Sequence, residues 1–386
     1  MEEWKEYKLG DVLTIKYGKD HKQLADGDIP IYGSGGIMRY GERSLYDGPS
    51  ILIPRKGSLN NVIYADKPFW TVDTMFWSII NDSIANPLFV YYSICKKDFA
   101  SLNVGSAVPS LTVPVIEDID ILLPSKATQD KVVSVLKSLD DKIELNRHIN
   151  DNLEQQAQAL FKSWFVDFEP FKEGKFVDSE LGMIPESWRV CSAETIFKIN
   201  IGKTPPRKEQ QWFTNINNGN VKWVSISDLG SNEIFIEDSK EYLTKEAIAK
   251  FNIIVVPEDT ILVSFKLTVG RVGISNCKLT TNEAVARFYL PESYFREYTY
   301  LSLKNYNYAR LGSTSSIATA VNSKIIKNMK LLIPPVTIIS EFSKKINPLF
   351  NTIRIYENEI RNLSKIRNTL LPKLISGELK INDINN

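Results

Sequence analysis

The chain has 386 residues, a formal net charge of +1, 43% hydrophobic residues and 24% charged residues. This length is too great for one ordinary domain, and the composition is typical of a soluble globular protein with hydrophobic cores. The small net charge excludes the strongly basic proteins that bind nucleic acid non-specifically, so any DNA binding must depend on local patches or on a partner.

Membrane and secretory segments are not expected. No apolar run approaches the ~18 residues of a transmembrane helix, and the N-terminus Met1–Lys5 is polar and lacks the apolar core of a signal peptide. Cys95, Cys191 and Cys277 are isolated and odd in number, which argues against a disulfide framework. We therefore expect a protein of the reducing cytoplasm.

Residues 1 to about 125 are rich in glycine, proline, aromatic residues and short β-branched runs. Turn chemistry such as Tyr46-Asp47-Gly48-Pro49 separates these runs, which predicts strands. The clearest strand-like runs are 29–32, 50–53, 61–64 and 119–123. A helix is expected from Pro87 to Phe99, with Asn86 as its N-cap and Pro87 at its first position.

A long helix is expected from Thr128 to about Phe168, where the chain has neither glycine nor proline. Its apolar or near-apolar positions alternate in steps of four and three, which is the seam of a coiled coil. These positions are Leu139, Ile143, Asn146, Asn150, Leu153, Ala157, Leu160 and Trp164. The two asparagines in the seam cost stability but specify register and partner orientation.

Residues 169–187 are interpreted as a linker. Residues 188 to about 335 again have the pattern that predicts strands and turns. A second long helix is expected from about Thr337, with an end near Leu371-Pro372 and Gly377 closing the segment. Its seam has the same alternation, in Phe342, Ile346, Leu349, Ile353, Tyr356, Ile360, Leu363, Arg367, Leu370 and Leu374. Pro348 is expected to kink this helix or delay its start.

The chain is an internal duplication. Trp4–Leu13 is echoed by Trp188–Phe197, and Gly18-Lys19 by Gly202-Lys203, both at a distance of 184 positions. Further matches are Gly105-Ser106 with Gly312-Ser313, and Ile121–Pro124 with Leu331–Pro334 at a distance of 210 positions. The repeat is far longer than the roughly 20–50 residues of a solenoid repeat. It is therefore a duplicated domain, and this indicates a two-fold target.

The order of the segments predicts the topology. The second globular unit begins where the first helix ends and finishes where the second helix begins, and the ends of a compact domain tend to lie close together. The two helices should therefore run antiparallel. The expected fold class is α+β, with two duplicated mixed α/β domains joined by a two-helix antiparallel coiled coil and related by a pseudo-two-fold axis.

Catalytic signatures are missing from the sequence. Gly202-Lys203-Thr204 lacks the leading glycine of a P-loop, because that position is Phe197. The turn Gly33–Gly36 fails the dinucleotide-binding pattern at Met38. Asn86–Phe89 and Asn347–Phe350 resemble the Asn-Pro-Pro-aromatic motif of adenine methyltransferases, but both lack the second proline and are interpreted as helix starts.

With only His21 and His148, a metal cluster or a histidine-based triad is not expected. We predict no catalytic and no metal-binding residue.

Basic and hydroxyl-bearing turns are the candidates for DNA contact. Arginine and lysine suit phosphates and guanine edges, and serine and threonine suit phosphates or either base edge. The competing interpretation is that such loops are ordinary solvated surface. The candidates are Lys19, His21, Lys22, Arg55, Lys56, Ser106, Ser110, Lys203, Arg207, Lys208, Lys266, Arg271, Ser313 and Thr314.

A dense aromatic run, Phe161–Phe168, lies at the end of the first helix. One interpretation is that it packs the helix end onto the second globular unit, and the other is that part of it docks a partner protein, because aromatics are enriched at interface cores. The candidates for partner contact are Phe161, Trp164, Phe165, Leu370 and Leu374.

Taken in order, these pieces resemble the specificity subunits of type I restriction–modification enzymes over essentially the whole chain. The segments that carry the resemblance are 4–11, 31–37, 55–58, 69–74, 105–111, 160–165, 182–188 and 370–379. The resemblance implies target-recognition domains at 1–125 and 187–335, helical spacers at 126–168 and 336–380, a linker at 169–186 and a tail at 381–386. Each domain would read one half of a bipartite DNA site.

The resemblance also implies the partners. The helices would set the gap between the half-sites and dock methylation subunits, which bind S-adenosylmethionine, while restriction subunits use ATP and magnesium. No cofactor, no catalytic role and no membrane partner are expected for this chain itself. Phe265–Arg271 stands where the first unit has Arg55–Ser58, so the two halves should read different sequences.

Two other functions remain open from the residues alone. One is a self-contained DNA methyltransferase or nuclease with its own recognition domain. The other is a coiled-coil adaptor without a role in DNA binding.

Overall fold

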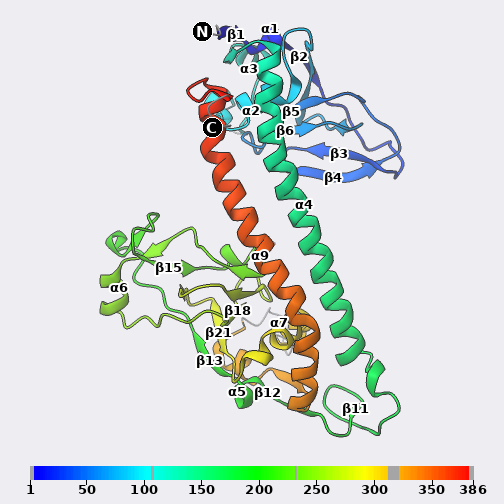
Figure 1. Ribbon diagram of the computed structural model, residues 1–386, viewed down its shortest axis with the longest axis vertical. Coiled ribbons are helices and arrows are strands. Elements are labelled where there is room, and N and C mark those ends of the chain that lie inside the picture. Colours follow the sequence, from blue (N-terminus) through cyan, green and yellow to red (C-terminus); the bar gives the residue numbers. More distant parts are fainter. Residues whose placement is uncertain (1–3, 106–107, 231–232, 312–320, 382–386) are drawn as a thin grey trace. The chain divides into compact units, whose positions relative to one another are not determined.

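The computed structural model describes residues 4–105, 108–230, 233–311 and 321–381. These residues form two compact units (Figure 1). Unit 1 combines residues 1–143 with residues 362–386, and unit 2 is formed by residues 144–361. Each unit therefore contains one part of each long helix, as well as a globular part of its own.

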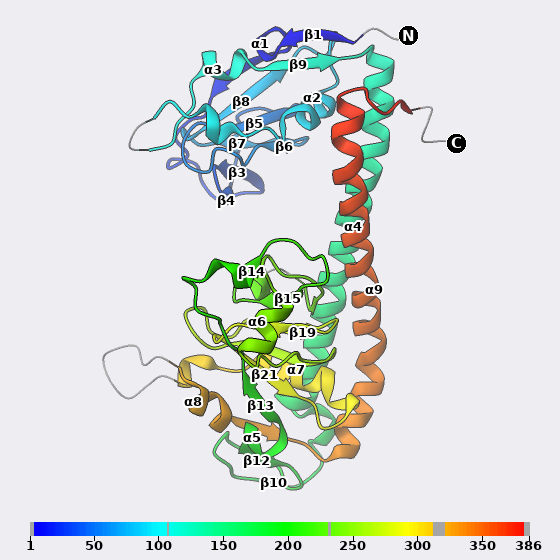
Figure 2. The ribbon, with the colours of Figure 1, turned by 90° about the vertical axis from the view of Figure 1, so that its left-hand side faces the viewer.

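The described residues of unit 1 form three small sheets. Strand β1 (Lys5–Lys8) pairs antiparallel with β9 (Asp120–Leu123), as Figure 2 shows. A four-stranded sheet has the order β2 (Leu13–Tyr17), β8 (Met75–Ile80), β5 (Ser50–Pro54) and β6 (Ile63–Ala65). A three-stranded sheet has the order β4 (Gly36–Gly41), β3 (Ile29–Gly33) and β7 (Trp70–Thr71). The helices of this part are α1 (Leu9–Val12), α2 (Pro87–Ile94), η1 (Phe99–Leu102) and α3 (Val113–Glu117).

The predicted start of helix α2 is confirmed. The Asn86 side chain accepts hydrogen bonds from the amides of Leu88 and Phe89, and Pro87 occupies the first turn, where its missing N–H costs nothing. The helix ends at Ile94, earlier than the expected Phe99. The reason is that Asp98 caps a separate turn, η1, by accepting a hydrogen bond from the Ala100 amide.

Unit 2 repeats this plan with additional strands. Strand β12 (Arg189–Ser192) pairs antiparallel with β22 (Lys330–Ile333). A five-stranded sheet has the order β13 (Lys198–Ile201), β21 (Val285–Tyr289), β18 (Ile261–Ser264), β19 (Val272–Ser275) and β16 (Phe235–Ile236). A four-stranded sheet has the order β14 (Phe213–Thr214), β17 (Tyr242–Leu243), β15 (Val221–Val224) and β20 (Thr280–Thr281).

The remaining elements of unit 2 are short. They are η2 (Glu169–Phe171), β10 (Phe176–Val177), β11 (Ile184–Pro185), α5 (Ala193–Ile196), η3 (Gln210–Trp212), η4 (Asp228–Gly230), α6 (Lys245–Lys250), η5 (Ser293–Phe295), α7 (Arg296–Lys304), η6 (Tyr308–Leu311) and α8 (Ser323–Asn328).

The strand orders confirm the duplication read from the sequence. The order β2-β8-β5-β6 of unit 1 recurs as β13-β21-β18-β19 in unit 2, and the pair β1-β9 recurs as β12-β22. The Gly-Lys repeat has a physical cause in both units. A Cβ on Gly18 would lie 2.0 Å from the Val72 carbonyl oxygen, and a Cβ on Gly202 would lie 2.0 Å from that of Asn282, so only glycine fits.

The long helices are α4 (Lys126–Phe165) and α9 (Val336–Ile375). Within unit 2, Asn146 of α4 donates a hydrogen bond to Glu359 of α9, whereas Phe161 packs on Phe342 with ring centroids 6.2 Å apart. Since the residue number falls in α9 as it rises in α4, the helices are antiparallel, as predicted. Figures 1 and 2 both show them side by side within each unit.

Two expectations for the second helix were wrong. Helix α9 already begins at Val336, so Asn347–Phe350 is not a helix start and Pro348 does not delay it. The start signal is instead Pro335, whose carbonyl accepts the hydrogen bond from the Ile338 amide. The helix also continues past Pro372 to Ile375, and it ends where Gly377 adopts a positive φ of 74°.

The side chains of both units enclose hydrophobic cores. Trp188, Phe197, Phe288 and the aromatic end of α4 belong to the main core of unit 2, and Leu9, Phe76 and Phe89 belong to that of unit 1. Over the part of the chain that the structure describes, no helix is both long and apolar enough to span a membrane.

Candidate nucleic-acid interface

In unit 1, the segment between β7 and β8 gathers the predicted basic residues. The Lys19 amide donates to the Thr71 carbonyl at 2.9 Å, and the Arg55 and Lys56 amides donate to the Thr74 carbonyl at 2.8 and 3.2 Å. The Arg55 guanidinium also donates to the Asp73 carbonyl at 3.2 Å. Lys19 and the pair Arg55-Lys56, which are distant from each other in the sequence, therefore both bond through their backbones to residues 71–74.

The turn Arg55–Ser58 is fixed by two further loops. Lys56 forms an antiparallel bridge with Ser110, and the Gly57 amide donates to the Pro109 carbonyl at 3.2 Å. Gly57 has a φ of 90°, and a Cβ there would lie 2.7 Å from Ser34 Oγ. This brings Ser110 and the Gly33–Gly36 turn into the same site. Ser106 lies outside the described residues.

His21 and Lys22 follow Lys19 on the same loop. Arg39 donates from Nε to His21 Nδ1 at 3.3 Å and from Nη2 to the His21 carbonyl at 2.7 Å. A neutral His21 that accepts at Nδ1 carries its own proton on Nε2, which makes Nε2 a donor. His21 lines an open hollow of about 480 Å³ together with residues 33–38 and 72–74, while Lys22 is exposed.

In unit 2, Lys203 occupies the position of Lys19. Its amide donates to the Thr281 carbonyl at 2.9 Å, as that of Lys19 does to Thr71. Its ammonium group donates to the Phe251 carbonyl at 2.7 Å. Lys203 is exposed, like its counterpart.

Arg207 is held by unit 2 itself. Its guanidinium donates two hydrogen bonds to the Glu241 carboxylate, both at 2.8 Å. It also lies over the rings of Phe213 and Trp223, at 4.4 and 4.5 Å from their centroids. The hydrogen bonds to Glu241 raise the pKa of Arg207 and lower the pKa of Glu241. These contacts favour a structural role for Arg207 over the predicted DNA contact.

Arg271 is also engaged within unit 2, because its Nη1 donates to the Ile226 carbonyl at 2.8 Å. It lies so close to Gly230 that a Cβ on that glycine would be 2.2 Å from Arg271 Nη1. Lys208 and Lys266, by contrast, are exposed. Ser313 and Thr314 lie outside the described residues.

The turn after β18 is the structural counterpart of the turn after β5. The Phe265 amide donates to the Ala284 carbonyl at 2.9 Å, as the Arg55 amide does to Thr74. This register makes Leu267 the counterpart of Gly57. Both residues have a positive φ, 58° for Leu267 and 90° for Gly57. Leu267 was not among the predicted site residues, although aligning the two copies at a distance of 210 positions would have set it against Gly57.

The five residues predicted to contact a partner protein pack inside the two units. Phe161, Trp164 and Phe165 are between 4% and 8% exposed. Phe165 packs on Trp188 and Phe342 with ring centroids 5.6 and 4.7 Å apart. Leu374 is buried in the core of unit 1, and the half-buried Leu370 packs against it. The structure favours the packing interpretation, and partner contact by these side chains stays a prediction.

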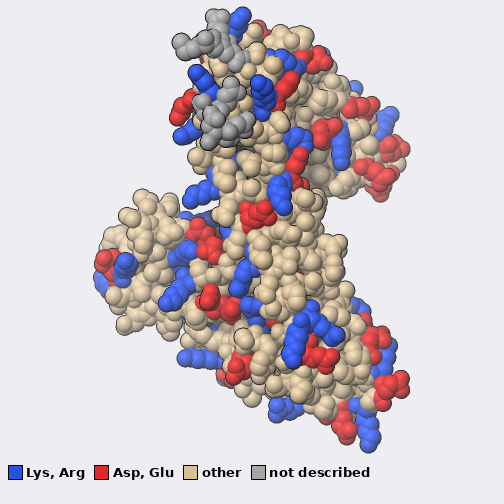
Figure 3. All heavy atoms as spheres, viewed as in Figure 1, with Lys and Arg blue, Asp and Glu red and all other residues tan. Residues whose placement is uncertain are grey.

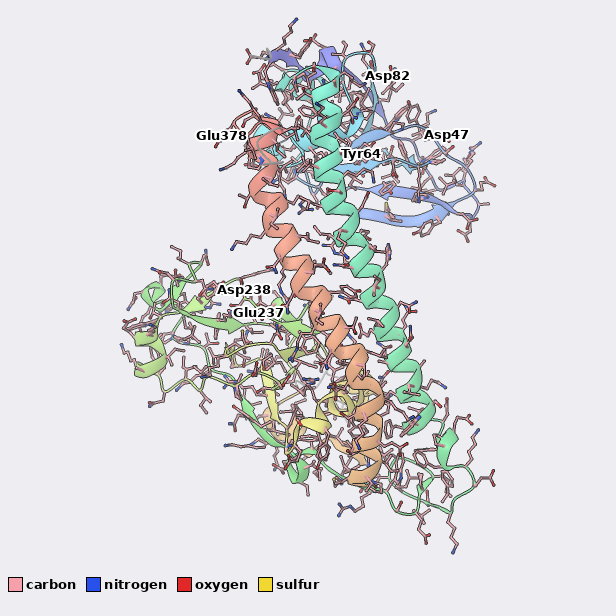
Figure 4. The ribbon with its side chains drawn as sticks, in the orientation of Figure 1. Asp47, Tyr64, Asp82, Glu237, Asp238 and Glu378 are labelled. Atoms are coloured by element: carbon pink, nitrogen blue, oxygen red, sulfur yellow. The ribbon has the colours of Figure 1, made fainter. Side chains whose placement is uncertain are left out.

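The acidic side chains of unit 2 that Figure 4 labels have structural partners. Glu237 and Asp238 lie next to each other at the end of β16. Glu237 accepts from Lys222 and Asn276, and Asp238 accepts from the Tyr242 hydroxyl. Among the described residues, no group of three or more His, Cys, Asp and Glu is placed to hold a metal ion.

The charged side chains do not form one extended patch of a single sign on the face that Figure 3 shows. Lysine and arginine alternate there with aspartate and glutamate over both units. The local basic turns described above, rather than a broad positive field, are therefore the candidate contacts with a polyanion.

Comparisons with known proteins agree with this arrangement. The family described as "Type I restriction modification DNA specificity domain" matches residues 1–155 and 185–365. The chain is 29% identical to the type I restriction enzyme MjaIX specificity subunit of Methanocaldococcus jannaschii, over 98% of this chain and 89% of that protein. It is 23% identical to the HindI specificity subunit of Haemophilus influenzae, over 98% and 100%.

Among solved structures, the chain is similar to the type I restriction–modification S subunit from M. genitalium. The TM-score is 0.63 at 16% sequence identity, and the match covers 97% of this chain and 96% of that one. At this identity the likeness concerns the fold alone.

Proposed function

This chain belongs to the family of type I restriction–modification specificity subunits, and from that premise we propose that its two units each read one half of a split site in double-stranded DNA. The observation that carries the proposal is the repeated loop arrangement. Gly18-Lys19 and Gly202-Lys203 hold the same hydrogen bonds in the two units, but the turns after β5 and β18 have different residues. One architecture used twice with different side chains suits two different half-sites.

In unit 1, the proposed contacts belong to the loops around residues 71–75. Lys19, Lys22 and Lys56 are exposed and suit phosphates. His21 Nε2 and the Ser110 hydroxyl suit base edges or phosphates. Arg55, which lies 5.5 Å from the centroid of the Tyr17 ring, adds a planar donor beside them.

In unit 2, the exposed Lys203, Lys208 and Lys266 are the proposed cationic contacts. Arg207 and Arg271 take a different role. Their bonds to Glu241 and to the Ile226 carbonyl support them as residues that shape the loops.

The helices are proposed to set the gap between the half-sites and to dock methylation subunits. The seam asparagine Asn146, which is buried and bonded to Glu359, supports a specified register of this pair. We retain the division into recognition domains at 1–125 and 187–335, spacers at 126–168 and 336–380, a linker at 169–186 and a tail at 381–386.

In the proposed assembly this chain is a non-catalytic cytoplasmic scaffold. Methylation subunits would bring S-adenosylmethionine, and restriction subunits would use ATP and magnesium.

Sequencing of methylated adenines in a host that carries this chain and its methylation subunits tests the proposal. We expect a split motif that disappears when the gene for this chain is deleted. Replacing residues 1–125 by the corresponding domain of another specificity subunit should change one half of the motif and leave the other half intact. A motif that is independent of this chain would contradict the proposal.

A methyl-transfer assay addresses the competing function, a self-contained methyltransferase. The purified chain alone, incubated with S-adenosylmethionine and duplex DNA, should transfer no methyl group, whereas the complex with methylation subunits should. Transfer by the chain alone would favour the enzyme alternative.

A further inference from the structure

The turn that follows β18 presents a leucine in a backbone conformation that leucine avoids. Leu267 has a φ of 58°, in the left-handed region where the Cβ of an L-residue crowds the following carbonyl oxygen. Its side chain is 97% exposed, so packing within the described part of unit 2 does not offset this strain. Strained residues that persist without a packing reason point to a function.

The comparison with unit 1 shows what the turn itself needs. The equivalent residue is Gly57, with a φ of 90°, and glycine adopts such a conformation without steric cost. Unit 2 therefore has leucine at a position of positive φ where unit 1 has glycine. What it gains is one exposed, branched apolar group next to the exposed Lys266.

The base of this turn is rigid although its tip is exposed. Ser264 is fully buried, and its hydroxyl donates to the Thr268 carbonyl at 2.6 Å and accepts from the Arg271 amide at 3.0 Å. The Gly270 amide donates to the Ser264 carbonyl at 2.9 Å. These bonds close the turn around Leu267, so its backbone is already ordered before any ligand binds, which lowers the entropic cost of binding.

An exposed leucine on such a turn matches a specific chemistry of DNA recognition. Apolar side chains contact the 5-methyl group of thymine in the major groove, or they insert between neighbouring base pairs. The adjacent Lys266 suits a backbone phosphate, which would position the turn on the duplex.

We propose that Leu267 is a specificity-determining residue of unit 2 that makes apolar contact with the bases of its half-site. This inference rests on the proposed function, since it requires that unit 2 bind DNA. It identifies one side chain whose removal should weaken recognition of one half of the site only.

The decisive variant is Leu267→Gly, which copies the residue of unit 1. The full chain in complex with its methylation subunits is titrated with duplexes that carry the split motif found by methylation sequencing. We expect a roughly 5- to 150-fold loss of affinity for the intact site, the range of losing one base-pair contact. The methylated motif should become degenerate in the half read by unit 2 and stay unchanged in the other half.

The stability of the variant separates this role from a structural one. Because Leu267→Gly removes strain and no packing, the midpoint of thermal unfolding should be unchanged or higher. A structural role would lower the midpoint. The control Met183→Ala, an apolar side chain of unit 2 that is 56% exposed, should change neither the affinity nor the motif.

Two modified duplexes identify the contact. Uracil in place of thymine in the half-site of unit 2 should weaken binding of the wild-type complex but not of Leu267→Gly if the contact is to a methyl group. 2-Aminopurine in that half-site should become more fluorescent with the wild type only if the leucine inserts between base pairs. Either result supports the proposal.

Wild-type affinity and an unchanged motif for Leu267→Gly would overturn the inference while leaving the proposed function intact. If the wild-type chain itself directs no split motif, the proposed function fails first, and the two failures are distinguishable.

Discussion

The carboxylate of Glu357 in α9 accepts a hydrogen bond from the Ile234 amide at 2.6 Å and a second from the Phe235 amide at 3.0 Å. The side chain is 3% exposed and lies within unit 2. These two hydrogen bonds therefore connect α9 to the start of β16 through a buried carboxyl group.

This contact predicts a pH dependence of stability. Burial raises the pKa of Glu357 from 4.5 to about 7, although the two amide hydrogen bonds act in the opposite direction. Between these values the folded chain retains a proton that the unfolded chain releases. The free energy of unfolding should therefore fall by about 3 kcal/mol as the pH rises through this window. Chemical denaturation from pH 4 to pH 8 measures it.

The variant Glu357→Gln provides the comparison, since it cannot titrate. The difference in the free energy of unfolding between wild type and Glu357→Gln should change across this pH window. Glu341→Gln, at an exposed position of α9, is the control. A constant difference for Glu357→Gln would contradict the assigned titration.

A buried ion pair should be sensitive to loss of its acid. Glu297 is fully buried and accepts from Arg296, Ser343 and Asn347. Glu297→Gln removes the fully buried one of the two carboxylates that pair with Arg296, and only Asp259, 3.0 Å from Arg296 Nη1, remains, so we expect a loss of about 1–3 kcal/mol in the free energy of unfolding. The double variant with Arg296→Met should recover part of this loss in urea denaturation. A single variant as stable as the wild type would contradict the prediction.

Substitution of the repeated glycines should affect the two units separately. In Gly18→Ala the new methyl group would meet the Val72 carbonyl, and in Gly202→Ala that of Asn282. Each should lower the stability of its own unit by about 1–3 kcal/mol, as overpacking does. In methylation sequencing, each variant should weaken recognition of a different half of the motif. For the stability measurement, Gly35→Ala, where a Cβ would meet no atom within 4 Å, is the matched control.

The salt dependence of DNA affinity should distinguish two kinds of cation. Lys56→Ala removes an exposed cation, so the slope of the logarithm of affinity against that of salt concentration should decrease by about one. Arg207→Ala removes a cation that is bonded to Glu241, so it should lower the melting temperature and leave this slope unchanged. Equal changes in slope would show that Arg207 also contacts phosphate.

The role of the helices as a ruler predicts the effect of an insertion. Two heptads added to each helix, between Ile143 and Glu144 in α4 and between Arg361 and Asn362 in α9, preserve the seam and lengthen each helix by about 21 Å. The unspecified gap in the methylated motif should widen while both half-sites stay the same. A single heptad in α4 alone should disrupt the pairing and abolish methylation. An unchanged gap with retained methylation would contradict the proposal that the helices set the gap between the half-sites.

Much of the fold was predictable because its signals are local or periodic. The alternation of four and three residues marks both helices, and Asn86-Pro87 marks the start of α2 through its cap. The expectation of a helix start at Asn347–Phe350 rested on the same kind of local signal, but it was wrong. A local helix-start signal cannot reveal that a helix is already running, and α9 tolerates Pro348 because tertiary packing of Phe342, Ile346 and Phe350 stabilises the helix around it.

The candidate site was predictable only in part. Residue type indicated basic loops, but it could not separate Lys208 from Arg207. Both are exposed, and the acidic partner of Arg207, Glu241, lies far away in the sequence. Nor could residue type single out Leu267, because its meaning depends on a backbone angle and on its exposure.

The sequence by itself determined the duplication, the antiparallel helices and the family resemblance, because each is carried by spacing along the chain. Tertiary structure decided which basic side chains are bonded within their own unit and which aromatic side chains are buried. It also decided which turns of the two units are equivalent. Those properties depend on hydrogen bonds and burial between segments that are distant in sequence, and the equivalence of Gly57 and Leu267 is supported by the equivalent places of β5 and β18 in the sheets of the two units.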